Sequence, residues 1–247
     1  MRFLRGTLLL SSLAAIVALA VVPAPAADDK KSDGEWVSLF NGKDLTGWKL
    51  QNPPSGSFKS ITEKKNADGK VTSIVGTPTK GDDITIWRVE DGLLIGGGPM
   101  THIYTEGGDY ENFHFRVEVK INDKGNSGMF FRAGFRPGVP KGYECQINAT
   151  HGDKVKSGSI YPNAEFGLDK FKPMTCVMDK AAHKPDEFFV QEVIADGPML
   201  TTIINGVKQI EWTDPKNTFT KGHFALQGHD PGSIMTFKKV EYKPLKK

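Results

Sequence analysis

The sequence predicts an all-β protein, and three observations carry that prediction. Several segments alternate apolar and polar residues with a period of two, as strands of a sheet do. Turn signals separate these segments, and no segment after the first 26 residues has a helical period. The 247-residue chain is 38% hydrophobic and 25% charged, as is typical of a folded globular protein. We therefore expect a two-sheet antiparallel β-sandwich, with a single domain over residues 27–247.

The amino-terminal segment is expected to lie outside this fold. Arg2 and Arg5 precede an almost entirely apolar run over residues 8–22, and Ala-Pro-Ala at 24–26 has the form of a cleavage site. This pattern is typical of a secretory signal peptide over residues 1–26, and it predicts a secreted or periplasmic protein of bacterial export. An uncleaved membrane anchor is the alternative, although the apolar run is short for a span.

The net charge argues against a nucleic-acid partner. The formal charge of the whole chain is +3, and residues 1–26 hold two arginines and no acidic residue, which leaves +1 for the rest. Without a basic excess or a basic cluster, a role in binding nucleic acid has no support. No later segment is apolar enough to cross a membrane, so none is expected to contact one after signal cleavage.

The clearest strand is "FHFRVEVKI", residues 113–121, where five apolar residues alternate with four polar ones. "ITIWRVEDGLLIG" (84–96) predicts two strands joined at Glu90-Asp91-Gly92. "MLTTIINGVKQIEW" (199–212) predicts a second hairpin, because Asn205-Gly206 accepts the positive φ angles of a type I′ turn. "HFALQG" (223–228) and "SIMTFKKVEY" (233–242) predict two more strands.

Two long stretches, residues 51–83 and 149–186, predict loops. They are rich in glycine and proline and have no apolar periodicity. Long loops within a compact domain are usually functional or disordered.

The segment "GYECQINAT", residues 142–150, presents two different faces. Tyr143, Cys145 and Ile147 fall on one side of the predicted strand and form its core face. Three polar residues, Glu144, Gln146 and Asn148, fall on the other side. If the sheet is curved, that side lines a groove, and the polar residues become candidates for a binding site.

The two cysteines, Cys145 and Cys176, leave two interpretations open. Export permits a disulfide between them. Alternatively, Cys145 is a buried thiol that packs as a small hydrophobic residue.

A set of motifs in fixed order resembles a known family, the 3-keto-disaccharide hydrolase domain family. The motifs are "FNGKDLTGW" (40–48), "WRVEDGLLIG" (87–96), "GNSGMFFR" (125–132), "GYECQI" (142–147), "SGSIY" (157–161), "NGV" (205–207) and "GHFALQGHDPG" (222–232). The resemblance implies a concanavalin A-like jelly roll, as found in glucanases and lectins. It also implies a carbohydrate substrate, a glycoside whose sugar is oxidised at C3.

The chemistry of such a substrate suggests roles for the polar residues. A ketone at C3 acidifies the C2 hydrogen, so a base can remove it and the enolate can expel the group at C1. Glu144 is the candidate base, and Arg132 or a bound divalent cation could stabilise the enolate. His229 is a candidate acid or metal ligand, because imidazole titrates near neutral pH.

The remaining candidates are assigned to substrate binding. They are four residues of the resembling motifs and of the strand at 142–150: Gln146, Asn148, Tyr161 and Gln227. No cofactor follows from the sequence with certainty. The conventional two-carboxylate route is disfavoured, because Gln146 stands where a second acid would follow Glu144 on the strand.

Each candidate also has a structural interpretation. Glu144 could be a solvated carboxylate, Arg132 a member of a surface ion pair, and residues 229–232 a turn. Residues 125–128 are most simply a tight turn, and a metal role for His151 and Asp153 is a minor alternative. At the level of the whole protein, the rival hypothesis is a non-catalytic, lectin-like carbohydrate-binding module, since this fold also serves lectins.

Overall fold

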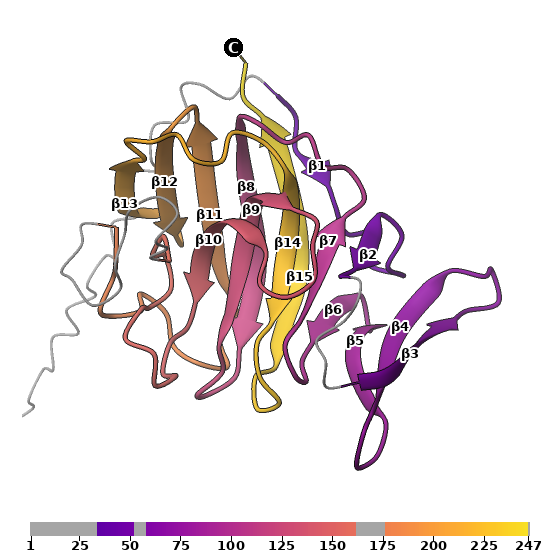
Figure 1. Cartoon of the computed structure of the whole chain (residues 1–247). Coiled ribbons are helices and arrows are strands. Elements are labelled where there is room, and N and C mark those ends of the chain that lie inside the picture. The colour runs from indigo at the N-terminus through magenta and orange to yellow at the C-terminus, as the bar shows by residue number, and fades with distance from the viewer. Residues whose placement is uncertain (1–33, 52–57, 162–175, 247) are drawn as a thin grey trace, which may run out of the picture.

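The computed structural model describes residues 34–51, 58–161 and 176–246, and these residues form strands and no helix (Figure 1). Every strand pair in the described part of the chain is antiparallel. The strands form two sheets, a larger sheet of ten strands and a smaller sheet of five. The predicted two-sheet antiparallel fold is therefore confirmed.

The larger sheet runs in the order β13 (Val207–Thr213), β12 (Met199–Ile204), β11 (Phe189–Asp196), β8 (Phe113–Ile121), β15 (Met235–Pro244), β6 (Leu93–Gly96), β5 (Ile84–Glu90), β4 (Val71–Pro78) and β3 (Phe58–Lys65), with β1 (Val37–Ser38) paired to β15. The smaller sheet runs in the order β10 (Lys141–Ile147), β9 (Ser127–Gly134), β14 (His223–Gly228), β7 (Thr101–Thr105) and β2 (Trp48–Leu50). Strands β9, β10 and β14 carry the motifs of the candidate site.

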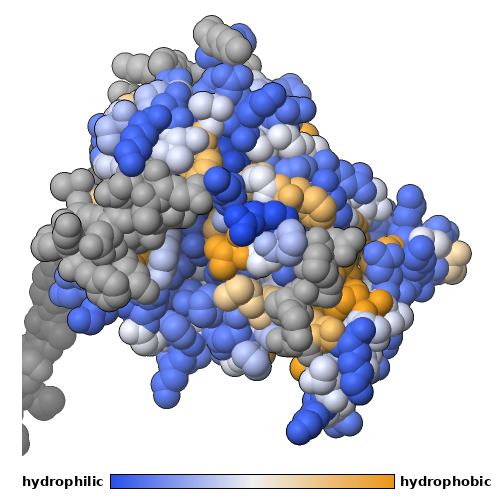
Figure 2. Space-filling model, viewed as in Figure 1, coloured by the Kyte–Doolittle hydropathy of each residue, from blue (hydrophilic) through white to orange (hydrophobic). Residues whose placement is uncertain are grey.

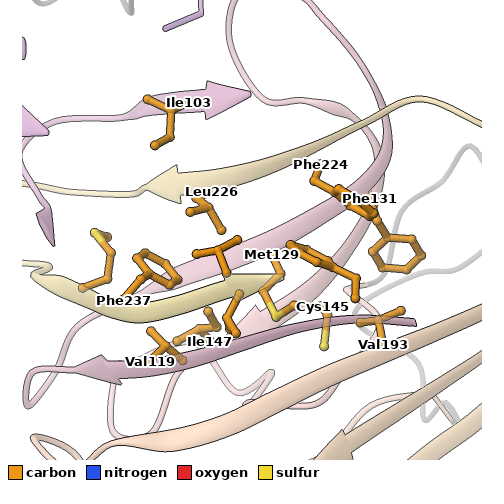
Figure 3. Close-up of a cluster of buried hydrophobic side chains, with 14 of the residues drawn as sticks. Ile103, Val119, Met129, Phe131, Cys145, Ile147, Val193, Phe224, Leu226 and Phe237 are labelled. Carbon is orange, nitrogen blue, oxygen red and sulfur yellow. The ribbon is translucent and has the colours of Figure 1, made fainter. Parts of the chain in front are cut away.

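The two sheets share one hydrophobic core. Met129, Cys145 and Ile147 come from the smaller sheet, and Val119 and Val193 come from the larger one (Figure 3). All five are fully buried. Fully burying an aliphatic side chain contributes about 1.5–3 kcal/mol, so this shared core holds the sheets face to face.

Both predicted hairpin turns are confirmed. Asp91 and Gly92 have φ angles of 51° and 77°, and Asn205 and Gly206 have φ angles of 49° and 78°. These are the positive values that a type I′ turn requires at both central positions. The turns join β5 to β6 and β12 to β13.

The prediction of a loop over residues 51–83 is wrong. This stretch contains β3 and β4, which pair with each other and project from the body at the lower right of Figure 1. Most residues of β3 are exposed, so the strand needs no alternating apolar face and gives no periodic signal. In the same view, hydrophilic residues predominate on this hairpin (Figure 2). The described residues of 149–186 form bends, turns and irregular backbone with one isolated bridge at Ile160, in agreement with the second loop prediction.

The two cysteines are free thiols, so the disulfide alternative is wrong and the buried-thiol alternative is confirmed. Cys145 and Cys176 are both fully buried in the hydrophobic core. Burial raises the pKa of both thiols, which keeps them protonated and poorly nucleophilic.

The predicted signal peptide over residues 1–26 lies outside the described residues. The described part of the chain holds no helix of the length and apolar character that a membrane span needs.

Candidate functional site

The two faces of β10 are as predicted at its centre. Tyr143, Cys145 and Ile147 are fully buried in the core between the sheets. Glu144 and Gln146 lie on the opposite face and line a cavity of about 140 Å³. The other residues that line it are Met100, Asn126, Val139, Tyr161, Gln227 and His229. Four predicted site residues besides Glu144, namely Gln146, Tyr161, Gln227 and His229, are therefore brought together with it.

Three separate parts of the chain meet at this cavity because of the strand order. β9 lies between β10 and β14, so the start of β9 is close to both Gln146 and Gln227. The segment after β10 folds back along it, since the amide of Tyr161 donates to Glu144 O at 2.8 Å and the amide of Gln146 donates to Ser159 O at 2.9 Å. This backbone pairing places the Tyr161 ring beside Glu144.

The Glu144 carboxylate lies over Gly128 on the neighbouring strand. A β-carbon at Gly128 would collide with the Glu144 side chain, so only glycine leaves room for this position of the carboxylate. Among the described residues, the carboxylate has no hydrogen-bond or ion-pair partner. Burial and, to a smaller extent, the negative charge of Asp153 together raise the pKa of Glu144 to about 8.

Three amide residues of the cavity lining have an unpartnered side-chain oxygen. Asn126, Gln146 and Gln227 all line the cavity and are at most 4% exposed. Their side-chain oxygens are buried and have no hydrogen-bond partner among the described residues. Buried polar atoms are nearly always hydrogen-bonded in folded proteins. Three unpartnered oxygens on side chains that line one small cavity therefore indicate a site for a ligand with donor groups.

Tyr161 is held in place by an acid. Its hydroxyl donates to Asp153 Oδ2 at 2.8 Å, and Asp153 Oδ1 accepts from the amide of Val155 at 3.0 Å. Burial and the bond to Asp153 raise the pKa of Tyr161, which keeps the phenol protonated. Asp153 thus positions the ring and adds negative charge behind Glu144, although it does not line the cavity.

His229 belongs to a cluster that could hold a metal ion. One donor atom from each of His151, His229 and Asp230 lies within 4.8 Å of the others. His229 Nδ1 lies 2.9 Å from Asp230 Oδ2. His229 Nε2 faces Asn126 Nδ2 at 3.3 Å, on the side of the cavity.

The prediction that Arg132 approaches this groove is wrong. Its guanidinium donates to backbone oxygens of Glu111, Gly197 and Phe219 at 2.7–3.1 Å, and Arg132 is 1% exposed. The cause is a bulge in β9. Arg132 has a φ angle of 50°, and the pairing with β14 shifts register between His223 and Ala225. One extra residue reverses the alternation, so the side chain turns away from the cavity.

The prediction that Asn148 faces the groove is also wrong. Its Nδ2 donates to the backbone oxygens of Asp153 at 3.0 Å and Val155 at 2.9 Å, and its Oδ1 accepts from the amide of His151 at 2.9 Å. Asn148 is fully buried and lies just beyond the end of β10, where the strand alternation stops. It closes the turn that carries His151 and Asp153.

Sequence reasoning missed several residues of the site. The sequence predicts only turns at residues 125–128 and 229–232, which contain Asn126 and Asp230, and it gives no signal for Met100 and Val139. The position of Asn126 directly before β9, next to the motif glycine Gly128, could have marked it as a polar residue at the strand entry. His102, also missed, pairs with Gln227 across β7 and β14. Burial, followed by the influence of His229, lowers its pKa to about 3, so it stays neutral.

Comparison with known proteins gives one family match. The model of the 3-keto-alpha-glucoside-1,2-lyase-like domain matches residues 35–243. No curated protein matches the sequence.

Several solved structures share the fold. A candidate glycosyl hydrolase from Parabacteroides distasonis is 23% identical, with a TM-score of 0.55 over 86% of this chain and 94% of that one. A second candidate glycosyl hydrolase from the same organism is 22% identical, with a TM-score of 0.56 over 85% and 100%. A β-1,3-1,4-glucanase from a mouse hindgut metagenome is 11% identical, with a TM-score of 0.51 over 85% and 99%. At these identities the similarity shows the jelly-roll fold.

Proposed function

The chain belongs to the 3-keto-alpha-glucoside-1,2-lyase-like domain family, and we propose that it cleaves the glycosidic bond of 3-keto-disaccharides or related 3-keto-glycosides. One observation carries the proposal. The Glu144 carboxyl group, with a pKa of about 8, has no partner among the described residues, and it lies in a cavity lined by three amide residues whose side-chain oxygens are also unpartnered there.

The proposed reaction begins at C2 of the oxidised sugar. The Glu144 carboxylate removes the C2 proton, and the electron pair moves into the C3 carbonyl to form an enolate. The enolate collapses to a C1–C2 double bond and expels the C1 oxygen, which takes up a proton. Water then adds at C1 while C2 regains a proton, so the products are a 3-keto sugar and a free alcohol. The first half of this route is the 1,2-elimination that the family's description names.

The raised pKa of Glu144 suits the base role. A base is most effective when its pKa lies near the working pH, because it must be both basic and substantially deprotonated. An ordinary carboxylate is a weaker base by several pKa units. The active form of Glu144 therefore becomes more populated as the pH rises toward about 8.

The amides supply the binding groups. Asn126, Gln146 and Gln227 present oxygens that accept hydrogen bonds from sugar hydroxyls, which ends their unpartnered state. The small cavity suits one sugar ring, because pockets for larger ligands start at about 300 Å³. Besides Glu144, the titratable groups of this lining are Tyr161 and His229. The raised pKa of Tyr161 makes its phenol a poor proton donor, so His229 serves as the acid for the leaving oxygen.

The conventional two-carboxylate route fits less well. Glu144 is the single acidic residue among the described residues that line the cavity. The carboxylate oxygens of Asp153 are engaged by Tyr161 and the Val155 amide. A second free carboxylate across the scissile bond is what both conventional geometries require.

The proposal is tested by product analysis in D₂O. Native and 3-keto disaccharides are incubated with the protein, and released monosaccharide is measured together with deuterium at C2. We expect release from the 3-keto substrate alone, with one deuterium at C2. Release without deuterium would reject the elimination route. Tight binding with no release from either substrate would favour a lectin-like module.

We also propose that the protein acts after export, on the basis of the apolar run and the cleavage-site pattern in residues 1–26. Amino-terminal sequencing of protein exported by its own host should give a start near Ala27. Recovery of material that still begins at the amino-terminal methionine would contradict this.

A further inference from the structure

The cluster of His151, His229 and Asp230 adjoins the cavity and is assembled from two loops. His151 lies in the turn after β10, and the other two residues begin the turn between β14 and β15. All three are partly exposed, so small ions can reach them. His229 also lines the cavity that Glu144 lines. A group bound at this cluster would therefore stand beside the proposed reaction.

The ring of His229 is held in a fixed orientation. Its Nδ1 lies 2.9 Å from Asp230 Oδ2, and Asp230 is itself fixed by Ser233 Oγ at 2.6 Å and the amide of Gly232 at 2.9 Å. A carboxylate at one imidazole nitrogen selects the tautomer whose other nitrogen is a free lone pair. Histidine ligands of metal ions are commonly oriented in this way.

Asn126 connects the two imidazoles. Its Nδ2 lies 3.3 Å from His229 Nε2 and 3.4 Å from His151 Nδ1, while its Oδ1 is buried without a partner among the described residues. A half-turn of the amide exchanges these two atoms and brings the oxygen to face both nitrogens. Two atoms that each lie about 2.1 Å from a tetrahedral ion are about 3.4 Å apart, so the observed spacing matches a shared cation.

We propose that His151, His229 and Asn126 bind one first-row divalent cation, with Asp230 as the residue that orients His229. Two imidazole nitrogens and one amide oxygen suit Zn²⁺, Co²⁺ or Mn²⁺ better than Mg²⁺ or Ca²⁺, which prefer oxygen ligands alone. In the structure the amide of Asp153 donates to His151 Nδ1 at 3.1 Å. A cation bound at His151 Nδ1 would replace this hydrogen bond.

The cation has a natural use in the proposed reaction, and that use rests on the proposed function. Arg132 cannot stabilise the enolate, since it is buried elsewhere. A cation at this cluster would polarise the C3 oxygen instead. His229 would then act as a ligand rather than as an acid, and the Asn126 oxygen would bind the cation, which leaves Gln146 and Gln227 to accept from the sugar hydroxyls. Binding of the cation itself requires no substrate, so it can be measured separately.

The experiment titrates untagged, metal-stripped protein with Co²⁺ and follows visible absorption and heat of binding. We expect one equivalent to bind and an absorption spectrum of nitrogen and oxygen ligation. His151→Ala and His229→Ala should each weaken binding by at least roughly tenfold, and Asp230→Asn by roughly tenfold. Asn126→Asp should tighten binding, because a carboxylate replaces the neutral amide. His223→Ala, which removes a partly buried imidazole from the other end of the smaller sheet, should leave binding unchanged.

Two results would overturn the inference. One is the absence of stoichiometric binding by the folded wild-type protein. The other is equal affinity in the wild type and in both folded histidine variants. Turnover of 3-keto-glycosides is assayed in parallel, with and without chelator. Stoichiometric binding without turnover would retain the cation site and reject the proposed function. Chelator-insensitive turnover without cation binding would retain the proposed function and reject the cation site.

Discussion

Glu144 and Arg132 have ionisable side chains and lie on neighbouring strands, but they differ in their hydrogen-bond partners. Glu144 on β10 has no partner in the described structure and faces a cavity. Arg132 on β9 is buried with several carbonyl oxygens around its guanidinium. The buried arginine with several hydrogen-bond partners is structural, and the carboxyl group without a partner is available for a ligand.

The strongest test of this difference is Glu144→Gln. We expect turnover of a 3-keto-glycoside to fall by at least roughly 100-fold, because the amide cannot accept the C2 proton. Binding should change much less, since the shape of the side chain is kept. Steady-state kinetics and equilibrium binding measure the two effects.

The matched control is Glu118→Gln, which alters a carboxylate paired with Lys238 on the larger sheet. It should keep wild-type turnover. A folded Glu144→Gln protein with near-normal turnover would remove Glu144 from the mechanism and end the contrast with Arg132.

The second test is Arg132→Met. Removal of the guanidinium leaves buried carbonyl oxygens of Glu111, Gly197 and Phe219 without their donor. We therefore expect the free energy of unfolding to fall by about 3 kcal/mol. Urea denaturation measures the loss. Arg136→Met, in an exposed loop, should cost far less. If the folded Arg132→Met protein also lost turnover as severely as Glu144→Gln, the structural assignment of Arg132 would fail.

A third test moves the Glu144 carboxylate without changing its chemistry. In Gly128→Ala the new methyl group occupies the space where the carboxylate lies, so we expect turnover to fall on the order of tenfold. Gly134→Ala on the same strand is the control, because its nearest neighbour would be an ordinary contact at 3.8 Å. Equal turnover in both variants would show that the position over Gly128 does not matter.

The smallest expected effect concerns pH and stability. The folded-state pKa of Glu144 is about 8, above its ordinary value of 4.5. The unfolded chain therefore releases this proton first, and the free energy of unfolding contributed by Glu144 falls as the pH rises from about 4.5 to 8.

Glu144→Gln removes that dependence. Relative to the wild type, we expect the variant to gain on the order of 1 kcal/mol between pH 5 and pH 8. Urea midpoints at several pH values measure the gain. A constant difference across this range would mean that Glu144 titrates normally in the folded protein.

Much of this arrangement could be predicted from residue patterns. Period-two alternation and Asn-Gly turns report local backbone geometry, so the strands at 113–121 and 223–228 and both hairpins were predicted correctly. The opposed faces of Tyr143 and Glu144 follow from the same geometry.

What could not be predicted depends on contacts between distant segments. The bulge that turns Arg132 inward arises where β9 meets β14, and no pattern within β9 reveals it. Asn148 looked like a continuation of the strand, although its partners lie in the turn beyond it. The pairing of Asn126 with His151 and His229 joins three segments, and none of them shows it alone.

The projecting hairpin of β3 and β4 bears on whether separate molecules of this protein aggregate. Within the described residues, β3 pairs with β4 alone, so it ends the larger sheet. An open sheet edge is a template on which another chain can add a strand and start aggregation. The exposed side chains of Lys59, Glu63, Lys64 and Lys65 lie along this edge. Their charges oppose such pairing. The exposed polar residues that prevented prediction of β3 from the sequence therefore also help to prevent strand pairing between two molecules.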